Sequence, residues 1–330
     1  MKRLQHADQA VRLQRRRNGI AILISLATVT VLKLNFEPTP AGADASPGKI
    51  NVAKLSASVG GALPAMPAPV QTASISGEHV GRRDVDYNVE ANRLTLLFNL
   101  FLLEQGHARL AKAPDYTATF FKHERIGGEM LDPQVMELKL RHAPFSVYMK
   151  WHEGEVGREL LYVAGENDGK MIVHPGGLRG RLLPSIKLEP DSNLSMRETR
   201  HPVTMVGMLN LAHEIITRRK AEMKANADIR CQLIEDQMIN DRPCYCFVLN
   251  WVHQHESEEY RKSIQYIDKE LSIPVCVKNF AWPDSEEPIP AEKLDEETLT
   301  EHYAYTDIQF DKKLTAGDFD RANEEYHFRR

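Results

Sequence analysis

The chain has 330 residues, of which 42 are Lys or Arg and 46 are Asp or Glu, and its formal net charge is −4. Residues 1–43 hold seven basic and two acidic residues, so they carry +5 and the remainder carries about −9. An acidic remainder of this length gives no chain-wide attraction for nucleic acid. We therefore expect no nucleic-acid partner.

The start of the chain has the pattern of an export signal. Arg15, Arg16 and Arg17 precede an uncharged apolar stretch at residues 19–32, which Lys33 ends. Small residues at 41–45 offer cleavage sites. An uncleaved anchor over residues 19–34 and a cytoplasmic apolar helix are the alternatives. We expect residues 1–45 to be a signal peptide or membrane anchor, which places the protein in the periplasm or cell envelope.

Two further regions follow. Residues 46–84 are rich in Pro, Ala, Ser and Gly and lack a sustained apolar period, which predicts a flexible linker. Residues 85–330 have a globular composition and are long enough for one large domain with a single core.

A helix is predicted at residues 92–110, where leucine and phenylalanine are dense and proline is absent. Its apolar face is too wide for a solvated helix, so we expect it to be covered on most sides. A core helix packed on a sheet is favoured over a helix that docks on a membrane or a partner.

Two groups of strands are predicted on either side of a second helix. In this helix, Pro202 is placed in the first turn and Arg218, Arg219 and Lys220 at the end. The strands are short apolar or alternating runs separated by turn residues. They are expected at residues 116–124, 136–142, 145–151, 160–164 and 170–174, and again at 229–235, 244–252, 261–267, 274–281 and 302–310.

Links of hairpin length make these strands antiparallel neighbours. The order of elements predicts an α+β fold, a strongly curved antiparallel sheet that forms an open half barrel with helices covering its concave face.

Two strands carry rows of bulky side chains that share one face. These rows either fill the core or line a cavity for an apolar ligand, because the interior volume grows with the curvature of a sheet. The predicted cavity residues are Phe145, Val147, Met149, Trp151, Tyr245, Phe247, Leu249 and Trp251.

No pattern that carries a specific chemistry is present. The chain has no nucleophile elbow, no phosphate loop and no His-Glu-x-x-His. His253 and His255 share one face of a strand end, but solvated loop residues are favoured over a metal site. The sequence at 123–125 offers a general-base cluster, but a charge ladder with Glu137 and Lys139 on an exposed strand edge is favoured. We predict no catalytic residue, no metal and no cofactor.

The four cysteines are Cys231, Cys244, Cys246 and Cys276. A two-residue turn at 240–241 would place Cys231 opposite Asn250, out of reach of a disulfide with Cys244 or Cys246. Structural or free thiols are therefore favoured over a disulfide or a zinc site.

Several motifs resemble an uncharacterised family of exported bacterial proteins known only as a domain of unknown function. They lie at residues 124–128, 141–150, 157–159, 165–170 and 318–328, and the resemblance covers residues 94–328. More distantly, the element order resembles periplasmic lipoprotein carriers and outer-membrane lipoprotein receptors, whose half barrel holds acyl chains. This resemblance implies a role in handling lipids or lipoproteins.

The expected function is that of a non-enzymatic envelope protein that binds an apolar small molecule or a lipoprotein acyl chain. An envelope protein is left open as a second partner. The alternative is a structural or interaction module with a filled core and no ligand. The third hypothesis is an envelope hydrolase or metal enzyme that uses His253 and His255.

Overall fold

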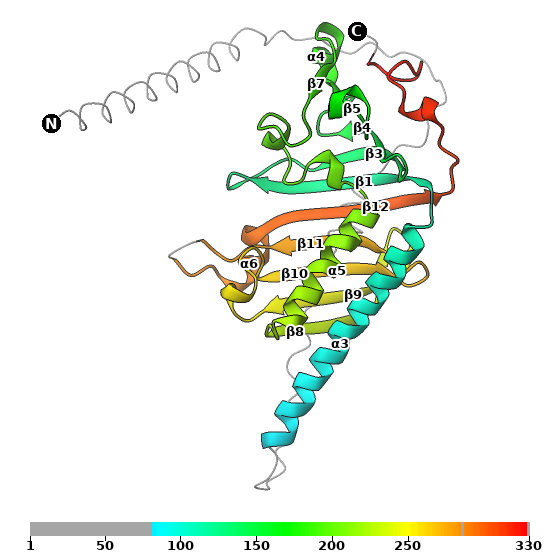
Figure 1. Ribbon diagram of the computed structural model, residues 1–330. Coiled ribbons are helices and arrows are strands. Elements are labelled where there is room, and N and C mark those ends of the chain that lie inside the picture. Colours follow the sequence, from blue (N-terminus) through cyan, green and yellow to red (C-terminus); the bar gives the residue numbers. More distant parts are fainter. Residues whose placement is uncertain (1–80, 285–286, 329–330) are drawn as a thin grey trace, which may run out of the picture. The chain divides into compact units, whose positions relative to one another are not determined.

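The computed structural model describes residues 81–284 and 287–328 of the chain (Figure 1). The predicted export signal lies outside these residues, as does nearly all of the predicted linker at 46–84. Among the described residues, no helix is both long enough and apolar enough to cross a bilayer.

One antiparallel sheet of twelve strands forms the body of the domain. Its order is β7-β6-β5-β4-β3-β1-β12-β11-β10-β9-β8, and β2 pairs with β1. The strands are β1 (Asp115–Ile126), β2 (Glu129–Met130), β3 (Gln134–Arg141), β4 (Ser146–Glu153), β5 (Glu159–Val163), β6 (Met171–His174), β7 (Ile186–Leu188), β8 (Ile229–Ile239), β9 (Arg242–Trp251), β10 (Lys262–Asp268), β11 (Pro274–Phe280) and β12 (Leu299–Phe310). All ten predicted strands are present, whereas the short β2 and β7 were not predicted.

The two groups of strands join at the centre of the sheet, where β1 pairs with β12. Phe120 lies opposite Tyr305, and their rings stack with centroids 4.7 Å apart. Register shifts interrupt several pairings, and such bulges increase the twist of a sheet. The outermost strands, β7 and β8, do not pair with each other. The predicted open half barrel is therefore confirmed.

Two long helices lie across one face of the sheet, which we call the inner face (Figure 1). The helices are α3 (Gly81–Leu110), α4 (Gly177–Leu182), α5 (Met208–Lys224) and α6 (Ala291–Thr298). Five short 3-10 turns complete the described elements: η1 (Asn167–Gly169), η2 (Ser195–Arg197), η3 (Val203–Met205), η4 (Gln254–Glu256) and η5 (Ala316–Phe319). The predicted covering of the sheet by α3 and α5 is confirmed.

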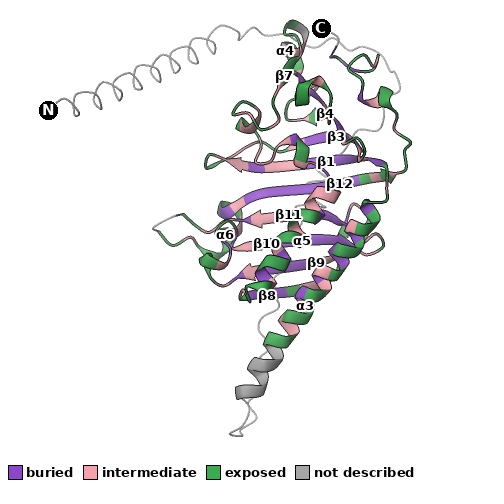
Figure 2. Ribbon diagram, in the orientation of Figure 1, coloured by how far each residue is buried: buried purple, intermediate pink, exposed green. Residues whose placement is uncertain are grey.

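Over residues 89–110, helix α3 is covered on one side only, so the prediction that the helix at 92–110 is covered on most sides is wrong. Leu103 is fully buried, but Leu94 is 61% exposed and Phe101 is 52% exposed. The helix packs on α5 and β8 and extends beyond the edge of the sheet (Figures 1 and 2). A Cβ on Gly106 would lie 2.0 Å from the Ser272 carbonyl oxygen, so glycine permits the close approach of α3 to the β10–β11 turn.

Helix α5 begins later than predicted. Pro202 precedes the separate turn η3, and α5 starts at Met208. The break lies at Gly207, whose φ of +112° is incompatible with a continuous helix. Two sheet hydroxyls hold this bend, since the Gly207 N–H donates to Tyr305 at 3.3 Å and the Met208 N–H donates to Tyr116 at 3.0 Å.

Substitution of Gly207 by alanine is expected to destabilise the domain by about 1–3 kcal/mol. The added Cβ would lie 2.6 Å from Leu140 Cδ1 and 3.0 Å from the Tyr116 hydroxyl, at a φ that alanine disfavours. Urea denaturation measures the loss. The matched control is Gly317→Ala, where the new Cβ meets only Thr315 Oγ1, at 3.4 Å. Equal stability of the two variants would contradict the role given to Gly207.

The end of the chain packs on the other face of the sheet, which we call the outer face. The rings of Tyr148 and Tyr326 stack with centroids 3.9 Å apart, and Phe328 is fully buried. The fully buried Glu159 accepts hydrogen bonds from the backbone N–H of His327 at 2.9 Å and from its Nδ1 at 2.7 Å. Residues 319–328 therefore belong to the fold.

Candidate functional site

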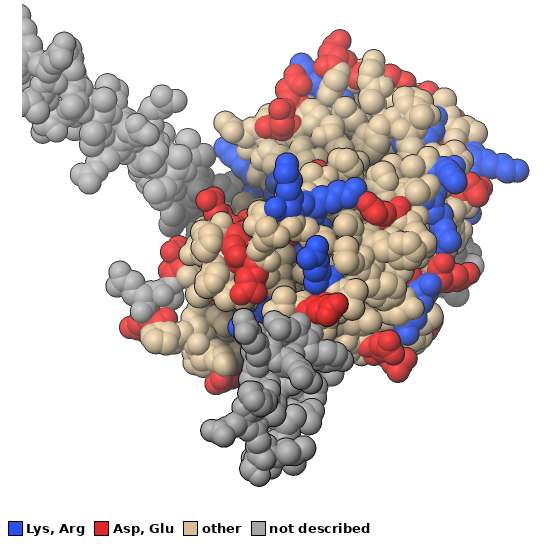
Figure 3. Space-filling model, turned by 60° about the horizontal axis from the view of Figure 1, so that its bottom comes forward, with Lys and Arg blue, Asp and Glu red and all other residues tan. Residues whose placement is uncertain are grey.

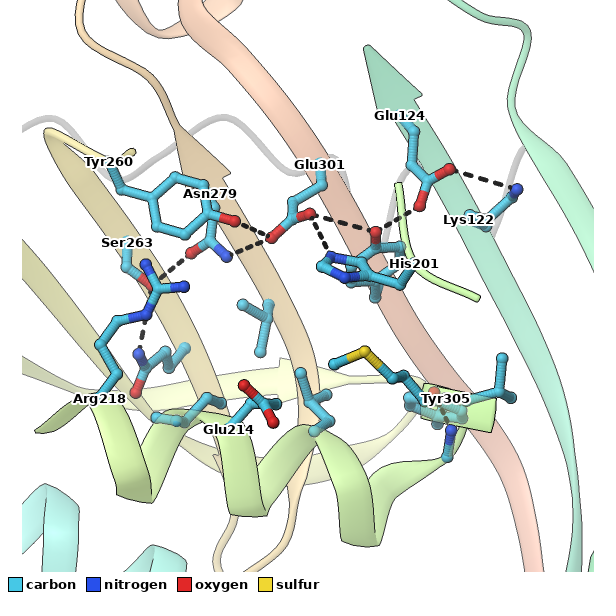
Figure 4. Close-up of a pocket in the computed structure, with 18 of the residues that line it drawn as sticks. Lys122, Glu124, His201, Glu214, Arg218, Tyr260, Ser263, Asn279, Glu301 and Tyr305 are labelled. Carbon is cyan, nitrogen blue, oxygen red and sulfur yellow. Dashed lines mark hydrogen bonds and ion pairs between the residues drawn. The ribbon is translucent and has the colours of Figure 1, made fainter. Parts of the chain in front are cut away.

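A cavity lies between α5 and the inner face of the sheet (Figure 4). The space that the centre of a water molecule can reach is about 130 Å³. This is room for about ten water molecules, or roughly 300 Å³ of liquid. Small-molecule sites occupy about 300–1,000 Å³, so the cavity is at the lower end of that range.

The alternation of strand residues builds one wall of this cavity, because every second side chain faces the same side. The sheet residues that line it include Phe120, Lys122 and Glu124 of β1, Ser263 and Gln265 of β10, Val277 and Asn279 of β11, and Glu301, Tyr303 and Tyr305 of β12. The opposite wall comes from α5 and the segment before it, with Met205, Val206, Leu211, Glu214, Ile215, Arg218 and Arg219. Most of the exposed lining is apolar, and Glu214, Arg218 and Arg219 of α5 add charged groups to the helix wall.

Glu301 lies at the centre of a polar cluster along one side of the cavity (Figure 4). Its Oε1 accepts hydrogen bonds from the Tyr260 hydroxyl at 2.8 Å and from Asn279 Nδ2 at 2.7 Å. Its Oε2 lies 3.0 Å from Arg200 Nε and 3.1 Å from His201 Nε2. The side chain is 4% exposed, so the carboxylate is held by neighbours rather than by solvent.

A second buried carboxylate, Glu124, is joined to Glu301 through Tyr303. The Tyr303 hydroxyl donates to Glu124 and lies 3.2 Å from Glu301 Oε2. Glu124 Oε2 also accepts from the Arg200 backbone N–H at 3.2 Å and forms an ion pair with Lys122 at 3.3 Å. The two acids therefore share one continuous hydrogen-bond network.

The environment of Glu301 fixes its charge. Burial raises its pKa, but hydrogen bonds from His201, Asn279 and Tyr260 and the charge of His201 outweigh burial and lower the pKa to about 2. For His201, burial lowers the pKa, while its hydrogen bond to Glu301 and the charges of Glu301 and Glu124 raise it above the usual 6.5. The network favours an ionised acid beside a charged histidine.

The contact between His201 and Glu301 is expected to make stability depend on pH. Since the pKa of His201 is raised on folding, its contribution is present below about pH 6.5 and is lost as the pH rises through the raised value. The effect is about 1 kcal/mol or less, because the His201 side chain is 39% exposed. Urea denaturation of the wild type and His201→Gln is expected to show a larger difference near pH 5 than near pH 9. A difference that does not change with pH would contradict this prediction.

A second, smaller cavity adjoins the first. The space in it that the centre of a water molecule can reach is about 70 Å³. Both are lined by Phe120, Lys122, Thr199, His201 and Val206. Residues 199–206 therefore run between two spaces on the inner face.

Three of the eight predicted cavity residues line one of these two cavities, and the other five line neither. Trp251 lines the larger hollow, and Met149 and Trp151 line the smaller one. The others pack in the core or against it: Val147, Phe247 and Leu249 are fully buried, and Phe145 and Tyr245 are half-buried. Ligand contact at these eight positions stays a prediction.

The sequence analysis does not identify the polar cluster. The prediction that Glu124 belongs to an exposed charge ladder with Glu137 and Lys139 is wrong. Glu124 is 3% exposed, faces the inner side and pairs with Lys122 of its own strand. Its spacing of two and four residues from Lys122 and Phe120 was the available signal, because it places all three on one face.

The residues considered for other chemistries lie elsewhere. The rings of His253 and His255 stack with centroids 5.4 Å apart at η4. Within residues 81–284 and 287–328, no three acidic, histidine or cysteine side chains are grouped so as to hold a metal.

The cysteines are buried and unpaired, as predicted for structural or free thiols. Burial raises the pKa of Cys231 to about 12 and that of Cys246 to about 11, so both are protonated at neutral pH. The predicted turn at 240–241 is present, but Cys231 lies opposite Leu249 rather than Asn250, because a register shift between Ile234 and Gln237 displaces the strand by one residue.

Acidic and basic side chains are interspersed on the face drawn in Figure 3. This face therefore offers no large field of positive charge, which a nucleic-acid interface would need.

The fold and site define an open half barrel with a partly apolar cavity beneath a helix. A family model described as "Protein of unknown function (DUF1571)" matches residues 113–328. The chain belongs to this family, which confirms the family resemblance found in the sequence. A search of curated proteins finds no match.

Three solved structures illustrate the distant likeness. A lipoprotein of Mycobacterium tuberculosis, LppX, is 9% identical with a TM-score of 0.38, over 67% of this chain and 98% of that one. An outer-membrane lipoprotein-sorting protein domain from Vibrio parahaemolyticus is 12% identical with a TM-score of 0.30, over 66% and 96%. A DUF1329 family protein from Desulfovibrio piger is 11% identical with a TM-score of 0.34, over 68% and 97%. These likenesses concern the fold alone.

Proposed function

We propose that this protein is a non-enzymatic component of the bacterial cell envelope that binds the apolar chain of a lipid or lipoprotein in the cavity beneath α5. The observation that carries the proposal is the arrangement of the cavity, whose exposed lining is mostly apolar and which has a polar cluster along one side. An amphipathic ligand matches this arrangement, since its chain would remove apolar surface from water and its polar end would meet the cluster.

The polar cluster supports binding rather than catalysis. Glu301 is already engaged by five neighbouring side chains, and its pKa of about 2 makes it a poor general base at neutral pH. Glu124 is similarly held by Lys122, Tyr303 and the Arg200 backbone.

The placement in the envelope rests on the sequence. The basic residues before the apolar stretch at 19–32 support export, and residues 19–34 would tether the domain to the inner membrane if they are not cleaved. The linker at 46–84 would then allow the domain at 85–330 to move relative to the membrane.

A second candidate function is an interaction module with a filled core and no ligand. The small volume of the cavity favours this candidate, as does the close packing of Val147, Phe247 and Leu249 in the core. It predicts an unliganded protein and a protein partner in the envelope.

Photo-crosslinking separates the two candidates. The full chain in phospholipid vesicles is supplied with a diazirine-bearing fatty acid, irradiated and mapped by peptide mass spectrometry. Binding predicts labelled peptides from α5 and β12, which form opposite walls of the cavity. Absence of label from both walls would overturn the proposal in favour of the interaction module.

Two matched variants locate the ligand. Ile215→Trp adds an indole to a residue that lines the cavity, whereas Thr217→Trp adds it to an exposed position of the same helix. If the indole displaces two methylene groups of the acyl chain from the cavity, binding weakens roughly tenfold. We therefore expect Ile215→Trp to reduce labelling of the cavity walls by at least that factor. Thr217→Trp is expected to behave like the wild type, and equal labelling of both variants would contradict the assigned cavity.

A further inference from the structure

Exposed apolar side chains gather at the β7 edge of the sheet. Leu178 is 76% exposed, Leu182 is 83% exposed, and Leu183 and Ile186 are also exposed. Val156, which is 61% exposed, joins them, because its carbonyl accepts the Gly177 N–H at 2.9 Å. Single exposed leucines are ordinary on protein surfaces, but such a cluster marks a contact surface.

The net charge of this segment is opposite in sign to that of the domain. Residues 176–188 contain Arg179, Arg181 and Lys187 and no acidic residue, although residues 44–330 carry about −9 overall. Leucines interleaved with arginines are typical of segments that lie in the interface of an anionic membrane.

The position of this segment leaves it free to meet a surface. It comprises α4 and the edge strand β7, at the opposite edge of the sheet from β8, on which α3 packs (Figure 1). Figure 2 shows α4 with exposed colouring. A partner strand would find little to pair with, because β7 has only three residues. Binding to a bilayer does not require backbone pairing with an edge strand.

We infer that residues 176–188 and Val156 form a membrane-docking tip that inserts its leucine side chains into the interface of a bilayer rich in anionic lipid. This inference does not depend on whether the cavity beneath α5 holds a ligand.

A reporter on the tip tests the inference in the full chain. Leu182→Cys is labelled with an environment-sensitive fluorophore, and labelling is selective because the native cysteines are buried. The protein is mixed with vesicles of phosphatidylcholine, with or without phosphatidylglycerol, that contain a spin-labelled lipid as quencher. Binding of vesicles by residues 19–34 alone does not place the tip in the bilayer, so it does not quench this reporter.

We expect quenching at position 182 in the phosphatidylglycerol vesicles and none at a control reporter, Thr217→Cys, on the exposed side of α5. Replacement of Arg179, Arg181 and Lys187 together by glutamine is expected to weaken the partition of the tip into these vesicles about 100-fold. Circular dichroism checks that this variant is folded.

The inference would be overturned by no quenching at position 182, by equal quenching without phosphatidylglycerol, or by quenching that the triple glutamine variant retains. Shielding of position 182 only after addition of an envelope protein fraction would assign the tip to a protein partner instead and would equally overturn it. A negative result here leaves the photo-crosslinking of the cavity walls unchanged, so the two proposals fail separately.

Discussion

Replacement of Arg219 by methionine is expected to lower the free energy of unfolding by about 3–5 kcal/mol near pH 8. Arg219 is 1% exposed, and its Nη1 donates to Glu222 Oε2 at 2.7 Å. The Trp251 indole N–H donates to the other oxygen of Glu222 at 3.0 Å. Methionine fills the space but leaves a buried carboxylate without its counter-charge. Urea denaturation measures the loss, and thermal unfolding should show a fall in Tm of roughly 10 °C.

The control for this variant combines Arg219→Met with Glu222→Gln. Glutamine keeps an acceptor for Trp251 and removes the charge, so most of the lost stability is expected to return, because neutral replacement of a buried ion pair is often nearly without effect. Burial raises the pKa of Glu222. A buried carboxyl with a raised pKa destabilises the folded state when it is charged, that is, at high pH. The stability lost in Arg219→Met should therefore become smaller as the pH falls toward about 5. A single variant as stable as the wild type near pH 8 would contradict this account.

Replacement of Glu301 by alanine is expected to have the second large effect, a loss of about 3–5 kcal/mol near pH 7. The substitution removes the acceptor for Tyr260 and Asn279 and the counter-charge for Arg200. These groups lie on separate elements along one side of the cavity, so the loss should also loosen the segment at 199–206. Urea denaturation reports the stability, and hydrogen exchange reports the segment.

The matched control is Glu301→Gln, which keeps an amide oxygen but no charge and should lose a smaller amount, about 1–3 kcal/mol. Because the pKa of Glu301 is lowered to about 2 from 4.5, its stabilising effect is present above about pH 4.5 and is lost as the pH falls toward 2. The deficit of the glutamine variant should therefore decrease in acid. Wild-type stability of the alanine variant would show that the cluster does not hold the site together.

The fold could be predicted to a large extent because its signals are local. Alternation in Met136, Leu138 and Leu140, and short links between strands, indicate antiparallel pairing without knowledge of distant contacts. The pairing of β1 with β12 could not be predicted in this way, because it joins strands far apart in the sequence. The start of α5 was missed since Gly207 bends the chain to meet Tyr116 and Tyr305, which lie on those distant strands.

The candidate site was less predictable for the same reason. The rows that contain Phe145 and Tyr245 were recognised by their bulk, but bulk does not distinguish a filled core from a lined cavity. The polar cluster brings together Glu124, His201 and Glu301 from three distant parts of the chain. Each residue alone resembles a surface charge, and only the assembled sheet shows that they are buried together.

The measurement that tests the central claim most directly is the lipid content of the full chain isolated from its native envelope. Solvent extraction and mass spectrometry would be applied to the wild type, Ile215→Trp and Thr217→Trp. We predict that an acyl lipid is bound in stoichiometric amount to the wild type and Thr217→Trp and is lost from Ile215→Trp. Equal lipid on all three proteins, or none on the wild type, would contradict a ligand in the cavity beneath α5.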